Sequence, residues 1–263
     1  MLHVGIATIC FHDQPVETAL AWCAAAEARG IELWGRGHLP AEAPDGAVAR
    51  VRALAEERGL EMACYGSYAR AGAAEWTPER FGRVLDIAAG LGAPRVRVWA
   101  GTTGSAAATA ADWQAVIEAL RRWGALAADR GITLVVERHG NTLTDYGDTA
   151  RRLIDRVNLP AVRLNYQVPY PPPAGGYADL AADLRRHLPV SAHIHVQNYR
   201  AEALTRAPLA EGIIRYDDWP PLLAEAAFDG WAMLEFLPEG SDLPPVELAQ
   251  AEMASLRALL NVR

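Results

Sequence analysis

The chain has 263 residues, about half of them apolar, which is enough to bury one large core or two small ones. All 25 basic residues are arginine, because the sequence contains no lysine, and this excludes every enzyme that works through a lysine Schiff base. The net charge is −7 and no arginine-dense run stands out, so we expect a small polar ligand and no nucleic acid.

No stretch approaches ~20 consecutive apolar residues, so we expect no membrane-spanning helix and no membrane partner. The N-terminal residues lack the charged segment and the small-residue cleavage site of a signal peptide. Together these features predict a cytoplasmic protein. The three cysteines, Cys10, Cys23 and Cys64, are odd in number and widely spaced, which favours reduced thiols over disulfides or a clustered zinc site.

Strand-like and helix-like segments alternate along the whole chain. The expected strands are Val4–Cys10, Ile31–Trp34, Leu60–Tyr65, Arg95–Trp99, Ile132–Val136, Val162–Gln167, Ala192–Val196 and Trp231–Phe236. The expected helices are Glu17–Arg29, Ala47–Arg58, Pro78–Leu91, Ala110–Arg130, Asp148–Val157, Tyr177–His187, Asp217–Ala227 and Leu248–Leu260. Glycines that follow helices, Gly30, Gly59 and Gly131, are interpreted as their C-caps, and Thr77 as the N-cap of the third helix.

Eight strand–helix units in a chain of this length, with no linker-like or low-complexity stretch, predict a single (β/α)₈ TIM barrel. We expect one domain over residues 1–263, with a doubly wound open sheet as the alternative. The Pro-rich stretch Pro169–Pro173 follows the sixth strand, where a barrel keeps its active-site loops.

Four neighbouring strands end in a side chain that can bind a metal ion. These side chains are Glu137, Gln167, His195 and Glu235. Because the carboxyl ends of barrel strands meet at one mouth, we expect a metal site there. The donor set is mostly oxygen, which favours one divalent ion, Mn²⁺ first or Mg²⁺, with Co²⁺, Fe²⁺ and Zn²⁺ as alternatives.

Side chains alternate along a strand, so parity assigns the neighbours of these ligands. If Glu137 points into the mouth, Arg138 points away from it and His139 lies on the Glu137 side. By the same rule Glu235 shares its face with Met233.

Several short runs together resemble the xylose isomerase-like TIM barrels, a group of sugar isomerases, epimerases and dehydratases that also includes the DNA-repair endonuclease IV. The runs are GIELWG, LVVERHG, HIHVQN, LAEGIIRYDDW and FDGWAMLEF, in that order along nearly the whole chain. The resemblance implies a metal-binding glutamate on strand five, an aspartate on strand six, a histidine on strand seven and a glutamate on strand eight. Glu137, His195 and Glu235 match this pattern, whereas Gln167 stands where the aspartate would be.

Other side chains near the strand ends are candidates for contact with a substrate. We assign this role to His139, Trp34, His38, Trp99 and Arg200. Tryptophan at the mouth of a barrel is a common wall for the apolar face of a sugar ring. Arg36 and Arg70 also follow strands, and either of them or Arg200 could bind a carboxylate or a phosphate, although the pattern favours a solvated surface arginine for at least two of the three.

The expected activity is a metal-dependent isomerisation or epimerisation of a small sugar or polyol-derived ketone. Glu137 and Glu235 would act as the acid–base pair of an enediolate mechanism, and the partner would be a small carbohydrate. A dehydratase or other lyase of a cyclic polyhydroxy ketone is the alternative enzyme, and a sugar-binding barrel without catalysis is the third hypothesis. An endonuclease ranks last, and a homo-oligomer stays an open alternative.

Overall fold

The computed structural model describes residues 1–169, 177, 179–201 and 205–262, and in it the predicted barrel is closed. Eight parallel strands pair in the order β1-β10-β7-β6-β5-β4-β3-β2, and β1 pairs with both β10 and β2. The strands are β1 (His3–Ala7), β2 (Gly30–Trp34), β3 (Glu61–Arg70), β4 (Arg95–Trp99), β5 (Thr133–Glu137), β6 (Val162–Tyr166), β7 (Ser191–Val196) and β10 (Trp231–Leu234). The (β/α)₈ prediction is therefore confirmed. The predicted Pro-rich active-site loop lies, from residue 170 on, outside the described residues.

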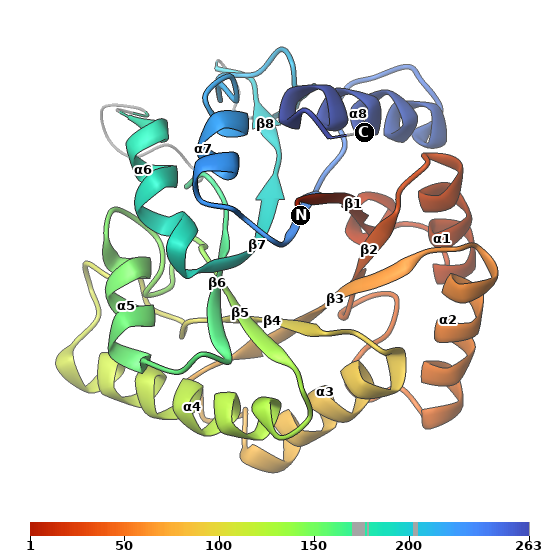
Figure 1. Ribbon diagram of the computed structural model, residues 1–263. Helices are drawn as coiled ribbons and strands as arrows, with labels where there is room; N and C mark the ends of the chain where they lie inside the picture. The colour runs from red at the N-terminus through yellow and green to blue at the C-terminus, as the bar shows by residue number, and fades with distance from the viewer. Residues whose placement is uncertain (170–176, 178, 202–204, 263) are drawn as a thin grey trace.

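The helices form a ring around the barrel (Figure 1). They are α1 (Val16–Ala25), α2 (Asp45–Glu57), α3 (Pro78–Leu91), α4 (Ala110–Ala128), α5 (Thr149–Val157), α6 (Leu180–His187), α7 (Trp219–Glu225) and α8 (Pro245–Leu260). Local signals define several ends as predicted. The Thr77 side chain accepts a hydrogen bond from the backbone N–H of Arg80, and Gly59 and Gly131 follow α2 and α4 at positive φ.

Gly30 does not cap a helix, so that prediction is wrong. Helix α1 ends at Ala25, and Gly30 is already the first residue of β2. A Cβ atom at Gly30 would come within 2.4 Å of the Trp231 ring, so the glycine is needed for close packing inside the barrel. The first strand also ends earlier than predicted, because Thr8–Phe11 forms a 3₁₀ turn, and a short antiparallel hairpin of β8 (Asn198–Tyr199) and β9 (Arg206–Ala207) was not predicted.

The two faces of the barrel strands differ in chemistry. The outward residues are apolar and pack against the helices in one continuous core, as the buried pairs Leu134/Val136 and Ile194/Val196 illustrate. The inward residues near the N-terminal end form a small apolar cluster of Ala63, Trp231 and Met233. Above this cluster the interior becomes polar and charged, with Glu32, Arg97, Asn165, His193 and His195 all buried.

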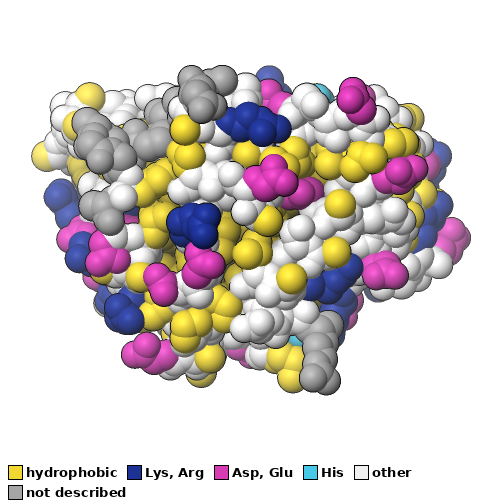
Figure 2. Space-filling view, turned by 90° about the horizontal axis from the view of Figure 1, so that it is seen from above, with side chains coloured by type: hydrophobic (Ala, Val, Ile, Leu, Met, Phe, Trp, Pro, Cys, Tyr) yellow, Lys and Arg dark blue, Asp and Glu magenta, His cyan; other side chains and the backbone are white. Residues whose placement is uncertain are grey.

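No helix within the described residues is long and apolar enough to cross a membrane. Cys23 and Cys64 are buried, Cys10 is half-buried, and all three are free thiols. On the face shown in Figure 2, acidic and basic side chains are intermixed and no field of one sign is visible.

Candidate active site

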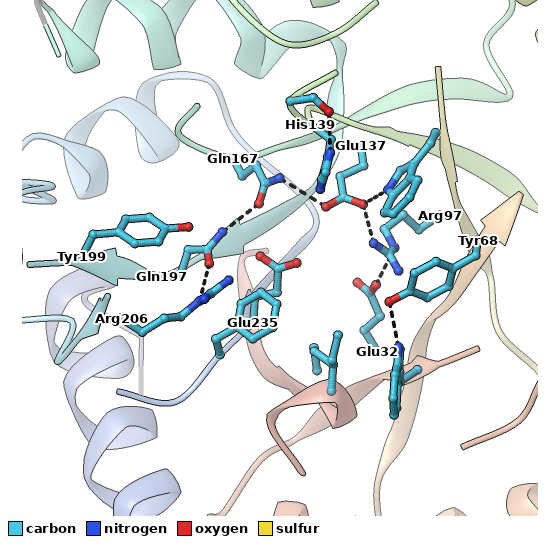
Figure 3. Close-up of a pocket in the computed structure, with 16 residues that line it drawn as sticks. Glu32, Tyr68, Arg97, Glu137, His139, Gln167, Gln197, Tyr199, Arg206 and Glu235 are labelled. Carbon is cyan, nitrogen blue, oxygen red and sulfur yellow. Dashed lines mark hydrogen bonds and ion pairs between the residues drawn. The ribbon is translucent and has the colours of Figure 1, made fainter. Parts of the chain in front are cut away.

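A pocket opens at the carboxyl ends of the strands, and Figure 3 shows the side chains that line it. Predicted site residues among them are Trp34, Trp99, Glu137, His139, Gln167 and Glu235. The parity argument holds at strand five, because His139 lines the pocket while Arg138 points outward and pairs with Asp183 of α6. Met233 also lies inside the barrel, on the same face as Glu235.

Glu137 and Glu235 line this pocket, and His195 lies buried beside both of them, outside the lining. The Nδ1 atom of His195 lies 3.2 Å from Oε1 of Glu235 and 3.7 Å from Oε1 of Glu137. These three side chains can each present one ligand atom within 4.8 Å of the others, and all three are buried. Three of the four ligands proposed from the sequence are thus brought together.

Glu32, on β2, is a buried member of the site that the sequence reasoning did not select. Its Oε2 atom lies 2.9 Å from Nε2 of His193 and 2.8 Å from Nε2 of His195. A carboxylate that accepts from one ring nitrogen of a histidine fixes its ring and leaves the other nitrogen free to bind a metal ion. Glu32 therefore directs Nδ1 of His195 toward Glu137 and Glu235.

Arg97, on β4, is the second buried group that was missed. Its guanidinium lies between two carboxylates, with Nε 3.1 Å from Oε1 of Glu32 and Nη1 bonded to Oε2 of Glu137 (Figure 3). The indole N–H of Trp99 donates to the same oxygen of Glu137. One oxygen of the Glu137 carboxylate, Oε2, thus accepts hydrogen bonds from two protein donors.

Gln167 belongs to a chain of hydrogen bonds that crosses the pocket (Figure 3). Arg206 Nε donates to Gln197 Oε1, Gln197 Nε2 donates to Gln167 Oε1, and Gln167 Nε2 donates to Glu137 Oε1 at 3.2 Å. In this arrangement Gln167 offers its amide N–H, and not its oxygen, to the carboxylate. A half-turn of the amide would be needed for Gln167 to act as a fourth ligand.

The donor set fits a divalent cation on two observations. The Oε2 atom of Glu235 is buried and has no hydrogen-bond partner among the described residues, although a buried carboxylate oxygen is costly without one. His195 is oriented by Glu32 as a ligand histidine would be. Glu137, His195 and Glu235 would hold such an ion.

The charges of the site are strongly coupled. Burial favours neutral carboxyl groups, but His195 and Arg97 outweigh it and hold the pKa of Glu32 well below its usual value; Arg97 and His195 do the same for Glu137. Burial opposes a charge on His195, yet Glu235 and Glu32 raise its pKa well above the usual value. Burial lowers the pKa of His193 to about 4, so His193 is neutral and serves as a donor to Glu32.

Aromatic rings form one wall of the pocket. Trp99 stacks on His139 at 4.7 Å between ring centres, and the Trp34 indole N–H donates to the hydroxyl of Tyr68. His38 is not among the pocket-lining residues: it lies behind Trp34, hydrogen-bonded to Thr8. Arg200 is exposed, donates to the backbone oxygen of Glu239, and also lies outside the lining.

The remaining lining residues include Tyr68, Gln197, Tyr199 and Arg206, none of which was assigned a role from the sequence. Arg206 lies in β9 and reaches the pocket over the ring of Phe236, 3.6 Å from its centre. No sequence signal predicted the hairpin that carries it. Gln197 could have been found by parity, because it lies two residues beyond His195.

A family model for the xylose isomerase-like TIM barrel matches residues 20–259. The chain therefore belongs to this family, as the sequence runs indicated. No curated protein matched the chain by sequence.

Solved structures with the same fold cover almost all of the chain. The probable 3-DHS dehydratase AsbF from Bacillus anthracis superposes with a TM-score of 0.78 at 23% identity, over 97% of this chain and 98% of that one. A D-psicose 3-epimerase gives 0.76 at 16% identity, over 98% and 99%. A xylose isomerase-like protein from Mycobacterium smegmatis, in complex with magnesium, gives 0.72 at 19% identity, over 98% and 97%. At these identities the likeness establishes the fold.

Proposed function

We propose that the protein is a divalent-metal-dependent isomerase or epimerase of a small sugar or polyol-derived ketone. The observation that carries this proposal is the convergence of Glu137, His195 and Glu235, two of which line an aromatic-walled pocket. The solved structures of similar fold include an epimerase crystallised with D-fructose, which supports a carbohydrate as the substrate class. A Mn²⁺ or Mg²⁺ ion held by these three residues would polarise the substrate carbonyl and acidify the adjacent C–H bond.

The two glutamates are not equivalent in their surroundings. Glu137 accepts hydrogen bonds from Arg97, Trp99 and Gln167, so its carboxylate is held in place and its charge is compensated. Glu235 keeps one buried oxygen without a partner among the described residues. We therefore assign the first proton abstraction to Glu235. Glu137, whose low pKa leaves it ionised, would return a proton from the opposite side after taking one from water, so an epimerisation by this pair exchanges the substrate's α-proton with solvent.

The position of the returned proton decides the product. Return by Glu235 to the neighbouring carbon gives an isomerisation, and return by Glu137 to the opposite face of the same carbon gives an epimerisation. A dehydratase is the second candidate, because the same abstraction precedes loss of a β-hydroxyl. The aromatic rings of Trp99 and Tyr68 in the pocket lining suit a flat cyclic substrate, which favours a dehydratase of a cyclic ketone as this second candidate.

The test replaces each glutamate separately in protein supplied with Mn²⁺, against a panel of ketoses, inososes and hydroxypyruvate in deuterated water. Glu235→Gln keeps the shape of the side chain and should lower turnover by ~10²–10⁴, together with uptake of deuterium at the α-carbon. Glu118→Gln, on the exposed part of α4, is the matched control and should behave as the parent. Parental turnover in Glu235→Gln would remove Glu235 from the mechanism, and an unsaturated ketone as product would favour the dehydratase.

A further inference from the structure

A second pocket adjoins the active site, on the side of β2, β3 and β4. The two pockets share Tyr68 and Trp99, which form the wall between them. The lining of the second pocket is unusually rich in arginine, with Arg36 after β2, Arg70 at the end of β3 and Arg80 in the first turn of α3. None of these arginines has a role in the proposed reaction.

Arg70 is the best-placed cation of this pocket. It is half-buried, its Cζ atom lies 4.0 Å from the centre of the Trp99 ring, and its Nη1 donates to the backbone oxygen of Gly101 at 3.2 Å. These two contacts fix the plane of the guanidinium. Arg70 forms no ion pair with a carboxylate among the described residues, and most of its five N–H donors remain free to bind a ligand.

The other charges leave the pocket cationic. Arg80 is compensated, because its Nη2 lies 3.2 Å from Oε1 of Glu42. Arg36 is exposed and lies over the ring of Tyr68, 5.6 Å from its centre, again with no ion pair among the described residues. Arg36 and Arg70 therefore add two positive charges beside the site. Glu75 and Glu137 favour the charge of Arg70 from a distance, but neither arginine forms an ion pair with a carboxylate among the described residues.

Trp99 connects this cationic pocket to the reacting groups. Its ring lies under Arg70 on the side of the second pocket, and its indole N–H donates to Glu137. A group bound to Arg70 would thus be one indole ring away from the carboxylates that we assign to proton transfer.

We propose that the pocket of Arg70 and Arg36 binds an anionic group of the substrate, a carboxylate or a phosphate, so that the substrate is a sugar acid or a sugar phosphate and not a neutral ketose. This inference rests on the proposed function for the identity of the bound molecule as a substrate. The binding chemistry rests on the arginines alone. A planar guanidinium held by stacking matches the two oxygens of a carboxylate or a phosphate in a paired geometry.

The experiment measures binding without turnover, by isothermal titration of the purified full chain with gluconate, glucose 6-phosphate and glucose. At least one of the two anions should bind, and glucose should bind at least tenfold more weakly than that anion. The stronger of the two anions identifies the carboxylate or the phosphate as the preferred group. Glucose binding as tightly as both anions would overturn the inference.

Variants locate the binding group. Arg70→Gln should weaken anion binding about tenfold to hundredfold, whereas Arg80→Gln, whose charge is already paired with Glu42, should change it less than threefold. Arg52→Gln, in an exposed pair on α2, is the control for loss of one surface charge. Parental affinity in Arg70→Gln refutes the site. If Arg70→Gln melts at a lower temperature than the parent, Arg36→Gln provides the second test, with a smaller loss expected, and unchanged binding in it counts against the proposal.

Two outcomes separate this inference from the proposed function. If anion binding depends on Arg70 but the protein is inactive on every substrate tried, the anion site is supported and the catalytic proposal is refuted. If neutral ketoses are turned over and Arg70→Gln does not change that turnover, the catalytic proposal is supported and the anion site is refuted.

Discussion

Arg97→Met tests the buried charge network more directly than any other change. Arg97 is 5% exposed, and its guanidinium lies between Glu32 and Glu137, which are 3% and 1% exposed. Methionine fills much of the same volume but leaves two buried carboxylates without their shared cation. Removing one partner of a buried ion pair typically costs ~3–5 kcal/mol. For a chain of this size, each kcal/mol lowers the melting temperature by about 2–4 °C.

Arg97→Met should therefore melt roughly 6–20 °C below the parent, as followed by circular dichroism during heating. Arg52→Met is the matched control, because Arg52 forms an exposed pair with Glu56 on α2, and it should shift the melting temperature by about 1–2 °C at most. The double variant with Glu32→Gln removes one of the stranded charges and should be more stable than Arg97→Met alone.

Two outcomes would contradict this reasoning. A melting temperature of Arg97→Met within about 2 °C of the parent would mean that the carboxylates do not need the guanidinium. A double variant that is less stable than Arg97→Met would mean that Glu32 is stabilised by its histidines and not by Arg97. The first result would also remove Arg97 as the explanation for the low pKa of Glu137.

Three other variants probe the site and its surroundings. His195→Ala should lose most of the divalent ion, about one per chain, measured by plasma emission spectrometry, and full occupancy would remove His195 from the ligand set. Gln167→Asp should tighten Mn²⁺ binding roughly tenfold by adding a charge next to Glu137, and an unchanged affinity would place Gln167 outside the ligands. Arg138 and Tyr166 donate hydrogen bonds to Asp183 and lower the pKa of its carboxyl group, against the opposing effect of burial. The contribution of Asp183 to stability is therefore present above the unfolded pKa near ~3.9, and it is lost as the pH falls through the lower pKa of the folded state. Asp183→Asn should flatten the acid limb of a plot of unfolding free energy against pH, and an unchanged slope would contradict this.

The barrel strands and the pocket residues at their ends could be predicted because both follow from the burial of parallel strands. Buried parallel strands need apolar outward faces, so runs such as Ile132–Val136 are visible as strands whatever their neighbours are. Because all eight strands end at one mouth, a polar residue at a strand end is placed by the fold alone. This is why strand-end position was sufficient to assign Glu137, Glu235 and Gln167 to the pocket.

Glu32 and Arg97 were missed because each lies in the middle of a strand. The run Ile31–Leu33, apolar at both ends and charged between, is also the pattern of a strand with one face in water. In a closed barrel no face of a strand is in water at that depth, so a charge there requires a partner of opposite sign on another strand. Once the fold is accepted, that requirement pairs the two residues.

Tertiary packing with no local signature decides the positions of two other residues. Gly30 follows a helix, as a C-cap glycine does, yet its position is set by the ring of Trp231, which is 201 residues later in the chain. His38 lies at the expected strand end, but the 3₁₀ turn that contains Thr8 gives its ring a hydrogen-bond partner there. Local sequence patterns contain no information on contacts that form only when distant parts of the chain pack together.

The pairing of β1 with β10, which closes the barrel, determines where aggregation of the protein would start. With every barrel strand paired on both sides, the described part of the chain presents no long strand edge to another molecule. Release of β1, only five residues long, would expose the edges of both β2 and β10 at once. Both edges are rich in apolar side chains, so fraying at this seam is the event from which intermolecular strand pairing and aggregation would start. Additives that slow precipitation of this protein should therefore be those that keep its first strand in place.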